Sequence, residues 1–200
     1  PGDAMKPLPV VAILGFPNVG KSTLFNRLVG RKKALVHSLP GMTRDAVSAI
    51  CVLGGKRFIL TDTGGLEPDA GAPMGAAVTD KAWAAARRAE VVLLVLDAKR
   101  ELAAAEEDLY ASLRRLGRPV IVVLNKVDSG NQEGRAGEYF NRFKAAEIVA
   151  VSAEHLRNLD DLETALVRRL PDQAGAAEPA PPLRLAIIGR TNVGKSSLVN

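Results

Sequence analysis

The stretch Gly15-Phe16-Pro17-Asn18-Val19-Gly20-Lys21-Ser22 decides the fold of this chain. It fits the pattern G-x-x-x-x-G-K-[ST] of a phosphate-binding loop. The apolar run Val10–Leu14 precedes it and favours a buried strand, and a helical pattern runs from Lys21 to near Gly30, where glycine is a common helix stop. A strand, this loop and a helix in that order predict a site that wraps the phosphates of a nucleotide.

Each part of the loop has a physical reason. Glycines let the backbone fold its N–H groups around phosphate oxygens, where a side chain would collide. We expect Lys21 to reach the β and γ phosphates and the Ser22 hydroxyl to bind Mg²⁺. The predicted phosphate contacts are Gly15, Phe16, Pro17, Asn18, Val19, Gly20, Lys21, Ser22 and Thr23.

Two further segments predict contacts to Mg²⁺ and to the γ phosphate. Asp62-Thr63-Gly64-Gly65 follows a β-rich run, where an Asp holds Mg²⁺ through water and a glycine N–H senses the γ phosphate. Thr63, Gly64 and Leu66 complete this part of the predicted site. Thr43, in the segment 41–45, is predicted to close over Mg²⁺ and the γ phosphate. The metal ligands are therefore Ser22, Thr43 and Asp62, and the catalytic group is Lys21, Asn18, Thr43 and Gly65.

The segment Asn125-Lys126-Val127-Asp128, which follows another apolar run, is predicted to bind the base of the nucleotide. The Asp128 carboxylate can accept two hydrogen bonds from guanine, whereas adenine offers no such donor pair. Asn125 can tie the base loop to the phosphate loop, and the Lys126 stem can cover the ring. A backbone N–H of Ser152-Ala153, after the last predicted strand, can reach the guanine oxygen. GTP and GDP are therefore the predicted nucleotides.

The rest of the sequence predicts a three-layer α/β fold of the phosphate-loop NTPase type. Short aliphatic runs predict buried strands, and alanine- and charge-rich stretches between them predict helices. Gly54 and Gly55 predict a hairpin, which adds one antiparallel edge strand to an otherwise parallel six-stranded sheet. The remaining expected strands are 47–53, 57–61, 91–96, 120–124 and 148–151, and the expected helices are 75–89, 103–116, 133–144 and 158–170.

The chain also contains a repeat. Residues 185–200 align without gaps on residues 11–26, with ten of sixteen positions identical. A repeat this long predicts the opening of a second domain. We expect 5–170 to form the first nucleotide-binding domain, 171–182 a Pro- and Ala-rich linker, and 183–200 the start of the second domain, without a working site of its own. Met5 resembles a natural start, so residues 1–4 are expected to lie outside the fold.

These motifs resemble a known family. Residues 10–170 are similar to the first G domain of the bacterial double-GTPase family Der (EngA), through PNVGKSTLFNRL, PGMTRD, DTGGLEPD, NKVD and VSA. The resemblance implies a GTPase that acts in assembly of the large ribosomal subunit, with that subunit or its rRNA as partner. Phe16 stands where the family usually has Arg, a residue that is not a phosphate ligand.

Turnover is expected to be slow, because Leu66 occupies the place where Ras-type enzymes have the glutamine that orients water. In potassium-activated relatives an asparagine at the place of Asn18 helps to hold a cation, so K⁺ is a predicted activator. The alternative is that Asn18 only shapes the loop. For the whole domain, the alternatives are a module that holds nucleotide with negligible turnover and a tRNA-modification type of G domain.

Composition agrees with a globular domain. The 200 residues carry a net charge of +5 and have a pI near 9.6. This excess of positive charge suits binding to a polyanion such as RNA, but basic residues on solvent-exposed faces of the domain also explain it. No apolar run is long enough to span a bilayer, so no membrane contact is expected. With one cysteine and no export signal at the start, we expect a reduced, cytoplasmic monomer without disulfides.

Overall fold

The computed structural model describes residues 7–31, 47–64, 80–128, 137–143 and 147–172. Its centre is a six-stranded sheet with the order β2-β3-β1-β4-β5-β6. Only the pair β2 and β3 is antiparallel, and every other neighbouring pair is parallel. The strands are β1 Val10–Leu14, β2 Val47–Leu53, β3 Lys56–Asp62, β4 Val91–Asp97, β5 Val120–Asn125 and β6 Glu147–Ala150. The predicted α/β architecture with a single antiparallel edge strand is confirmed.

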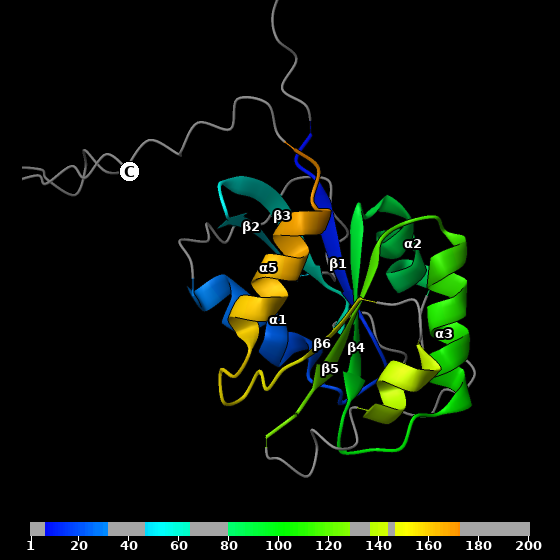
Figure 1. Cartoon of the computed structure of the whole chain (residues 1–200). Coiled ribbons are helices and arrows are strands. Elements are labelled where there is room, and N and C mark those ends of the chain that lie inside the picture. The colour runs from blue at the N-terminus through cyan, green and yellow to red at the C-terminus, as the bar shows by residue number, and fades with distance from the viewer. Residues whose placement is uncertain (1–6, 32–46, 65–79, 129–136, 144–146, 173–200) are drawn as a thin grey trace, which may run out of the picture.

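Helices cover both faces of the sheet (Figure 1). They are α1 Lys21–Arg31, α2 Asp80–Arg88, α3 Ala104–Arg115 and α5 Leu159–Arg169. Strand β1 divides its side chains between the two faces, because successive residues of a strand point to opposite sides. Val11 and Ile13 pack with α1 and α5, whereas Ala12 and Leu14 pack with α2 and α3. The core therefore consists of two apolar layers separated by the sheet.

The β2–β3 hairpin turns at Gly54 and Gly55, as predicted. Their φ values of 54° and 75° lie in the left-handed region, where glycine carries no Cβ penalty. Lys56, directly after the turn, reaches the end of α5. Its Nζ donates to the carbonyl oxygens of Val167 at 3.1 Å and Leu170 at 2.7 Å, and pairs with Asp172 at 2.9 Å. A lysine that caps the last carbonyls of a helix stabilises the helix end.

Most predicted boundaries agree with the structure within one residue. Strand β6 is shifted by one residue at both ends, to Glu147–Ala150 from the expected 148–151. The Val151 carbonyl accepts a hydrogen bond from the Val127 N–H at 3.0 Å, so this residue turns toward the base loop. The segment 137–142 is helical, within the helix expected at 133–144. Residues 1–6 and 173–200, and with them most of the linker and the whole repeat, lie outside the described residues.

Candidate nucleotide-binding site

The carboxyl ends of parallel strands meet at one edge of a sheet, where ligands of such sheets bind. The phosphate loop follows β1, Asp62 ends β3 and Asn125 ends β5. Ser152 and Ala153 come shortly after β6. The fold thus gathers motifs that lie more than a hundred residues apart in sequence at one edge of the sheet.

Close backbone approach explains two glycines of the phosphate loop. A Cβ on Gly15 would lie 2.4 Å from the Val95 carbonyl oxygen, and a Cβ on Gly20 would lie 2.4 Å from Asn125 Nδ2. Gly20 also has φ +96°, a conformation that L side chains rarely adopt. Strand β4 and the base loop therefore press directly against the phosphate loop, and only glycine fits at these two positions.

Lys21 begins α1 and is buried, with 4% of its surface exposed. Its Nζ donates to the Phe16 carbonyl at 2.7 Å, so the side chain folds back across the loop. The ammonium group therefore lies beside the loop and the start of α1, where the N-terminal end of the helix dipole adds positive potential. Ser22 and Thr23, the next two residues, are exposed.

Two of the predicted metal ligands converge at Gly64. A methyl group on its Cα would lie 2.9 Å from Ser22 Oγ and 3.1 and 3.3 Å from the two Asp62 carboxylate oxygens. The Gly64 N–H donates to Asp62 Oδ1 at 2.8 Å, and Thr63 Oγ1 donates to the Ile13 carbonyl at 2.6 Å. One hydroxyl and one carboxylate are hard oxygen donors, which fit Mg²⁺ when phosphate oxygens and water complete its shell.

Asn125 connects three loops. Its Nδ2 donates to the Val19 carbonyl in the phosphate loop, and its Oδ1 accepts from the Ala153 N–H at 3.0 Å. The predicted link between base loop and phosphate loop is therefore present as a contact. The Ser152 N–H in turn donates to the Arg157 carbonyl at 3.2 Å. Both backbone N–H groups of the Ser152-Ala153 pair therefore donate within the protein, and the Ser152 hydroxyl donates to the Asp128 carboxylate.

Asp128 has both carboxylate oxygens engaged. Ser152 Oγ donates to Oδ1 at 2.6 Å, and Lys99 Nζ pairs with Oδ2 at 2.6 Å. Hydrogen bonding from Lys99, and then from Ser152, lowers the pKa of Asp128 below its usual value. Arg157 Nη1 donates to the Asp128 backbone carbonyl at 2.7 Å. The carboxylate is thus held ionised and oriented, in the form that accepts hydrogen bonds from a base.

Lys126 has φ 67° and turns its side chain back over the phosphate loop. Its Nζ donates to the Asn18 carbonyl at 2.6 Å and to Asp97 Oδ2 at 2.7 Å. Asp97 is 4% exposed and ends β4 at the same sheet edge. Sequence reasoning missed Asp97, although a polar residue at the end of a buried strand was a usable signal. Lys99 and Arg157 had no such signal, because they lie in loops without a motif.

Thr43, Gly65 and Leu66 lie outside the described residues. His155 Nε2 is 3.9 Å from Asp128 Oδ1, and the described residues hold no cluster of three His, Cys, Asp or Glu side chains that could bind a metal. Trp83 is half-buried against the α2–α3 layer.

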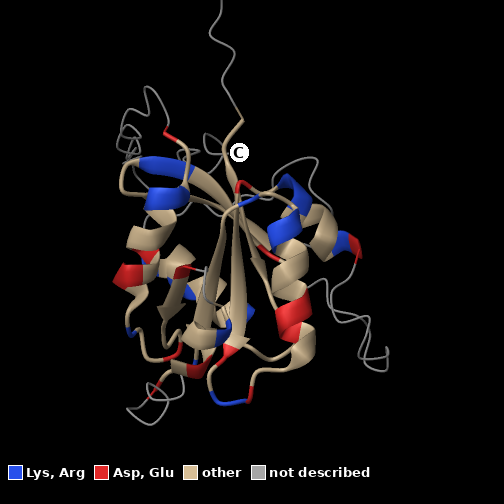
Figure 2. Cartoon of the chain, turned by 45° about the vertical axis from the view of Figure 1, so that its right-hand side comes forward, with Lys and Arg blue, Asp and Glu red and all other residues tan. Residues whose placement is uncertain are grey.

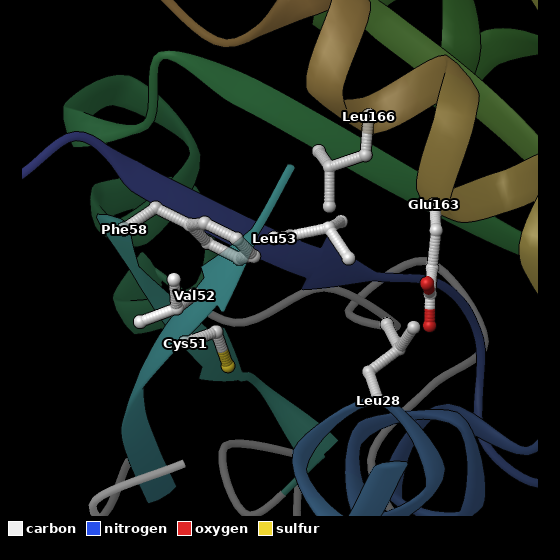
Figure 3. Close-up of a pocket in the computed structure, with 7 residues that line it drawn as sticks. All are labelled: Leu28, Cys51, Val52, Leu53, Phe58, Glu163 and Leu166. Atoms are coloured by element: carbon white, nitrogen blue, oxygen red, sulfur yellow. The ribbon is translucent and has the colours of Figure 1, made fainter. Parts of the chain in front are cut away.

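Cys51 lines an apolar pocket between the β2–β3 hairpin, α1 and α5 (Figure 3). Burial raises the pKa of its thiol to about 11, so the thiol stays protonated and unreactive at neutral pH. None of the predicted phosphate-, metal- or base-binding residues lines this pocket. The lining residues are Leu28, Cys51, Val52, Leu53, Phe58, Glu163 and Leu166.

Residues 10–126, which include the phosphate loop, Asp62 and the start of the base loop, match the family described as 50S ribosome-binding GTPase. The chain belongs to this family. GTPase Der of Geotalea daltonii is 43% identical over 196 residues, covering 98% of this chain and 44% of the relative. GTPase Der of Myxococcus xanthus is 46% identical over 203 residues, covering 98% and 44%. The predicted resemblance to the Der family is confirmed, and the chain spans less than half the length of these relatives.

Solved structures share the fold of this GTPase family member. The G domain of the iron transporter FeoB from T. maritima has a TM-score of 0.59 and 24% identity, covering 80% of this chain and 98% of that one. The elongation factor SelB from Methanococcus maripaludis, in complex with the GTP analogue GPPNHP, has a TM-score of 0.60 and 22% identity, covering 81% and 33%. At these identities the likeness concerns the fold alone. Within the described residues, no helix has the length and apolar character needed to cross a bilayer.

Proposed function

We propose that this chain binds GTP and hydrolyses it to GDP and phosphate. The observation that carries the proposal is the convergence of Lys21, Ser22, Asp62 and Asp128 at one edge of the sheet, joined by the Asn125 contacts. Water would attack the γ phosphorus, and the bond from that phosphorus to the β–γ bridging oxygen would break.

Phosphate binding falls to the phosphate loop. Lys21 is already folded into the loop, so little side-chain entropy is lost when its ammonium group meets the β and γ phosphates. Gly15 and Gly20 have no Cβ, so β4 and the base loop can lie directly against the phosphate loop. Ser22 and Asp62 would hold Mg²⁺, directly and through water, and the ion when bound would neutralise phosphate charge. Thr43 and Gly65 keep their proposed γ-phosphate roles on sequence grounds.

Base selection falls to Asp128. A carboxylate held ionised by Lys99 and Ser152 can accept from the ring N–H and the amino group of guanine. Adenine has no such pair of donors, so it would lose both hydrogen bonds to the carboxylate and bind more weakly. Lys126, fixed at its head by Asn18 and Asp97, would place its aliphatic stem beside the ring.

The finer properties of turnover rest on two residues. Leu66 has no group that could orient water, so slow intrinsic hydrolysis is proposed, with Asn18 helping to hold K⁺ beside the phosphates. The exposed Asn18 has φ 65°, which puts a left-handed kink in the loop. The matched family and the Der relatives support a partner in the large ribosomal subunit. A monomeric state and a cytoplasmic location stay predictions from the sequence.

Titration with labelled GDP, GTP and ATP tests this function, together with phosphate release in the presence of Mg²⁺. We expect guanine nucleotides to bind at least a hundredfold more tightly than ATP, because adenine lacks the two donors to the Asp128 carboxylate, and loss of these charge-assisted hydrogen bonds corresponds to roughly 3 kcal/mol. Asp128→Asn should shift preference toward xanthine nucleotides, whose ring presents an acceptor where guanine has its amino donor. Equal affinity for ATP and GTP would contradict the proposal, and tight binding without phosphate release would leave a nucleotide-holding module.

A further inference from the structure

Three helices share one charge pattern. Helices α2, α3 and α5 each carry one or two acidic residues in the first turn and two arginines in the last turn. The arginine pairs are Arg87 and Arg88, Arg114 and Arg115, and Arg168 and Arg169. In Figure 2 the blue bands lie on the upper ends of the helices, and red bands lie lower on them. One basic residue near a helix C-terminus is explained by the helix dipole, but a pair at each of three helices exceeds that need.

The topology brings two of these pairs together. Helix α2 ends just before β4 and α3 ends just before β5, and β4 and β5 are neighbours with Val92 opposite Val120. Neighbouring strands lie about 4.8 Å apart, so both helix ends lie at the amino-terminal edge of the sheet, next to adjacent strands. Arg118, two residues before β5, lies at the same edge. This edge is opposite the one where the nucleotide site lies.

The arginines on this side of the sheet have no carboxylate partners in the described part of the chain, and all five are exposed. Arg115 donates to the Ser112 hydroxyl at 2.8 Å, and Arg114 lies 6.0 Å from the centre of the Tyr110 ring, contacts that leave both charges uncompensated. The α5 pair differs, since Arg168 and Arg169 contact the Glu147 carboxylate at 3.4 and 2.7 Å. We call Arg87, Arg88, Arg114, Arg115 and Arg118 the amino-edge arginine cluster.

We propose that the amino-edge arginine cluster is a docking surface for the phosphate backbone of double-stranded RNA. This proposal rests on the ribosomal partner proposed above and adds the surface of this domain that meets the rRNA. Every cation in the cluster is an arginine, whose planar guanidinium binds phosphate oxygens in a bidentate manner. The described residues place no exposed aromatic ring among them, so the surface suits the backbone of a helix better than unstacked bases.

An anionic membrane is the other polyanion to consider. Basic surfaces that bind membranes usually insert apolar side chains beside their charges. The large apolar side chains exposed in the described residues are Val47, Phe140 and Leu156, and none of them belongs to α2, α3 or the segment that joins α3 to β5. The observations therefore favour RNA.

Binding of this chain to a fluorescent RNA duplex of about 20 base pairs, over a series of KCl concentrations, tests the proposal. The logarithm of the binding constant should fall linearly with the logarithm of the salt concentration, with a slope of about one per phosphate contact. The double variant Arg87→Gln/Arg88→Gln should reduce that slope by about two. The matched control is Arg168→Gln/Arg169→Gln, which removes the same charge from the same position of another helix and should change the slope by less than one.

GDP binding, measured on the same samples, should be unchanged in both variants, because the cluster lies at the opposite edge from the nucleotide site. Equal slopes for the two double variants would overturn the proposal, since net charge and not the cluster would then bind RNA. Loss of binding to phosphatidylglycerol vesicles in the α2 variant, with RNA binding intact, would assign the surface to a membrane instead. Failure of the wild-type chain to bind GDP would contradict the proposed function without changing the RNA result.

Discussion

The side-chain amide of Asn125 donates a hydrogen bond to the Val19 carbonyl at 2.9 Å, although the two residues lie 106 positions apart in the sequence. The same side chain accepts from the Ala153 N–H, so one buried group joins the phosphate loop to both base-side loops. Each loop alone has many conformations. Their common contact with Asn125 makes the site a single preorganised unit.

Asn125→Ala should therefore damage stability and binding together. The variant leaves the buried Val19 carbonyl and Ala153 N–H without their partner, at a cost of about 2 to 4 kcal/mol for two unpaired groups. Urea unfolding measures the change in midpoint, and nucleotide titration measures the loss of affinity. Asn26→Ala is the control, because Asn26 is exposed on α1 and the same substitution there should change stability by less than about 0.5 kcal/mol. Equal effects of the two variants would show that the contact contributes nothing.

Gly20→Ala should abolish nucleotide binding. The new methyl group would lie 2.4 Å from Asn125 Nδ2, and φ +96° strains any L residue. Gly30 in α1 supplies the matched control, since a Cβ there meets nothing within 4 Å. Gly30→Ala should stabilise the domain by about 0.5 to 1 kcal/mol, because alanine is the better helix former. Calorimetry with GDP and thermal unfolding separate the two outcomes, and a Gly20→Ala variant that binds normally would refute the close-approach argument.

The phosphate and base motifs were predictable because each is a short pattern at the end of a strand whose periodicity is visible in the sequence. The hairpin and the sheet were predictable for a similar reason. Gly54-Gly55 is a local pattern that indicates a tight turn, and the short aliphatic runs indicate buried strands. Contacts between loops were not predictable. Lys99 reaches Asp128, and Arg157 reaches the same residue, only because the fold brings three strand ends together. The shift of the β6 end also depends on a long-range contact, the one between Val127 and Val151.

Lys99→Met should move the acid limit of guanine binding to higher pH. Lys99 is the largest cause of the lowered pKa of Asp128, so its removal raises that pKa toward the usual value. Base recognition needs the ionised carboxylate and is lost as pH falls through the pKa. The stability that the depressed pKa contributes is likewise present above the unfolded-state value and lost as pH falls through the folded-state value. At neutral pH the affinity for GDP should fall up to about fivefold, as for a partly exposed ion pair.

A pH series of GDP titrations measures this shift. Ser152 and His155 still face Asp128 in the variant, and Arg157 still contacts its backbone carbonyl. The nearby carboxylates of Glu154 and Asp97 raise the pKa of Lys99 itself. Lys81→Met at the start of α2 removes the same charge elsewhere and should leave the pH profile unchanged. An unchanged profile in Lys99→Met would show that Ser152 and His155 hold the carboxylate ionised without Lys99.

Hydrolysis should be faster in KCl than in NaCl at equal ionic strength. Asn18 stands at the kink of the phosphate loop, where a monovalent cation could neutralise charge that develops between the β and γ phosphates. Asn18→Ala should remove the difference between the two salts while GDP affinity changes little. Phosphate release at saturating GTP measures the rates. If both salts give one rate in the wild-type chain, Asn18 only shapes the loop and another group positions the attacking water.

Lys56 ties the end of α5 to the β2–β3 hairpin. It contacts the carbonyls of Val167 and Leu170 and the carboxylate of Asp172, although it lies in β3, 111 positions before Val167 in the sequence. In mechanical terms the residue is an anchor. Tension applied at Asp172 would therefore load its contact with β3 together with the last turn of α5, so the sheet would share the force with the helix.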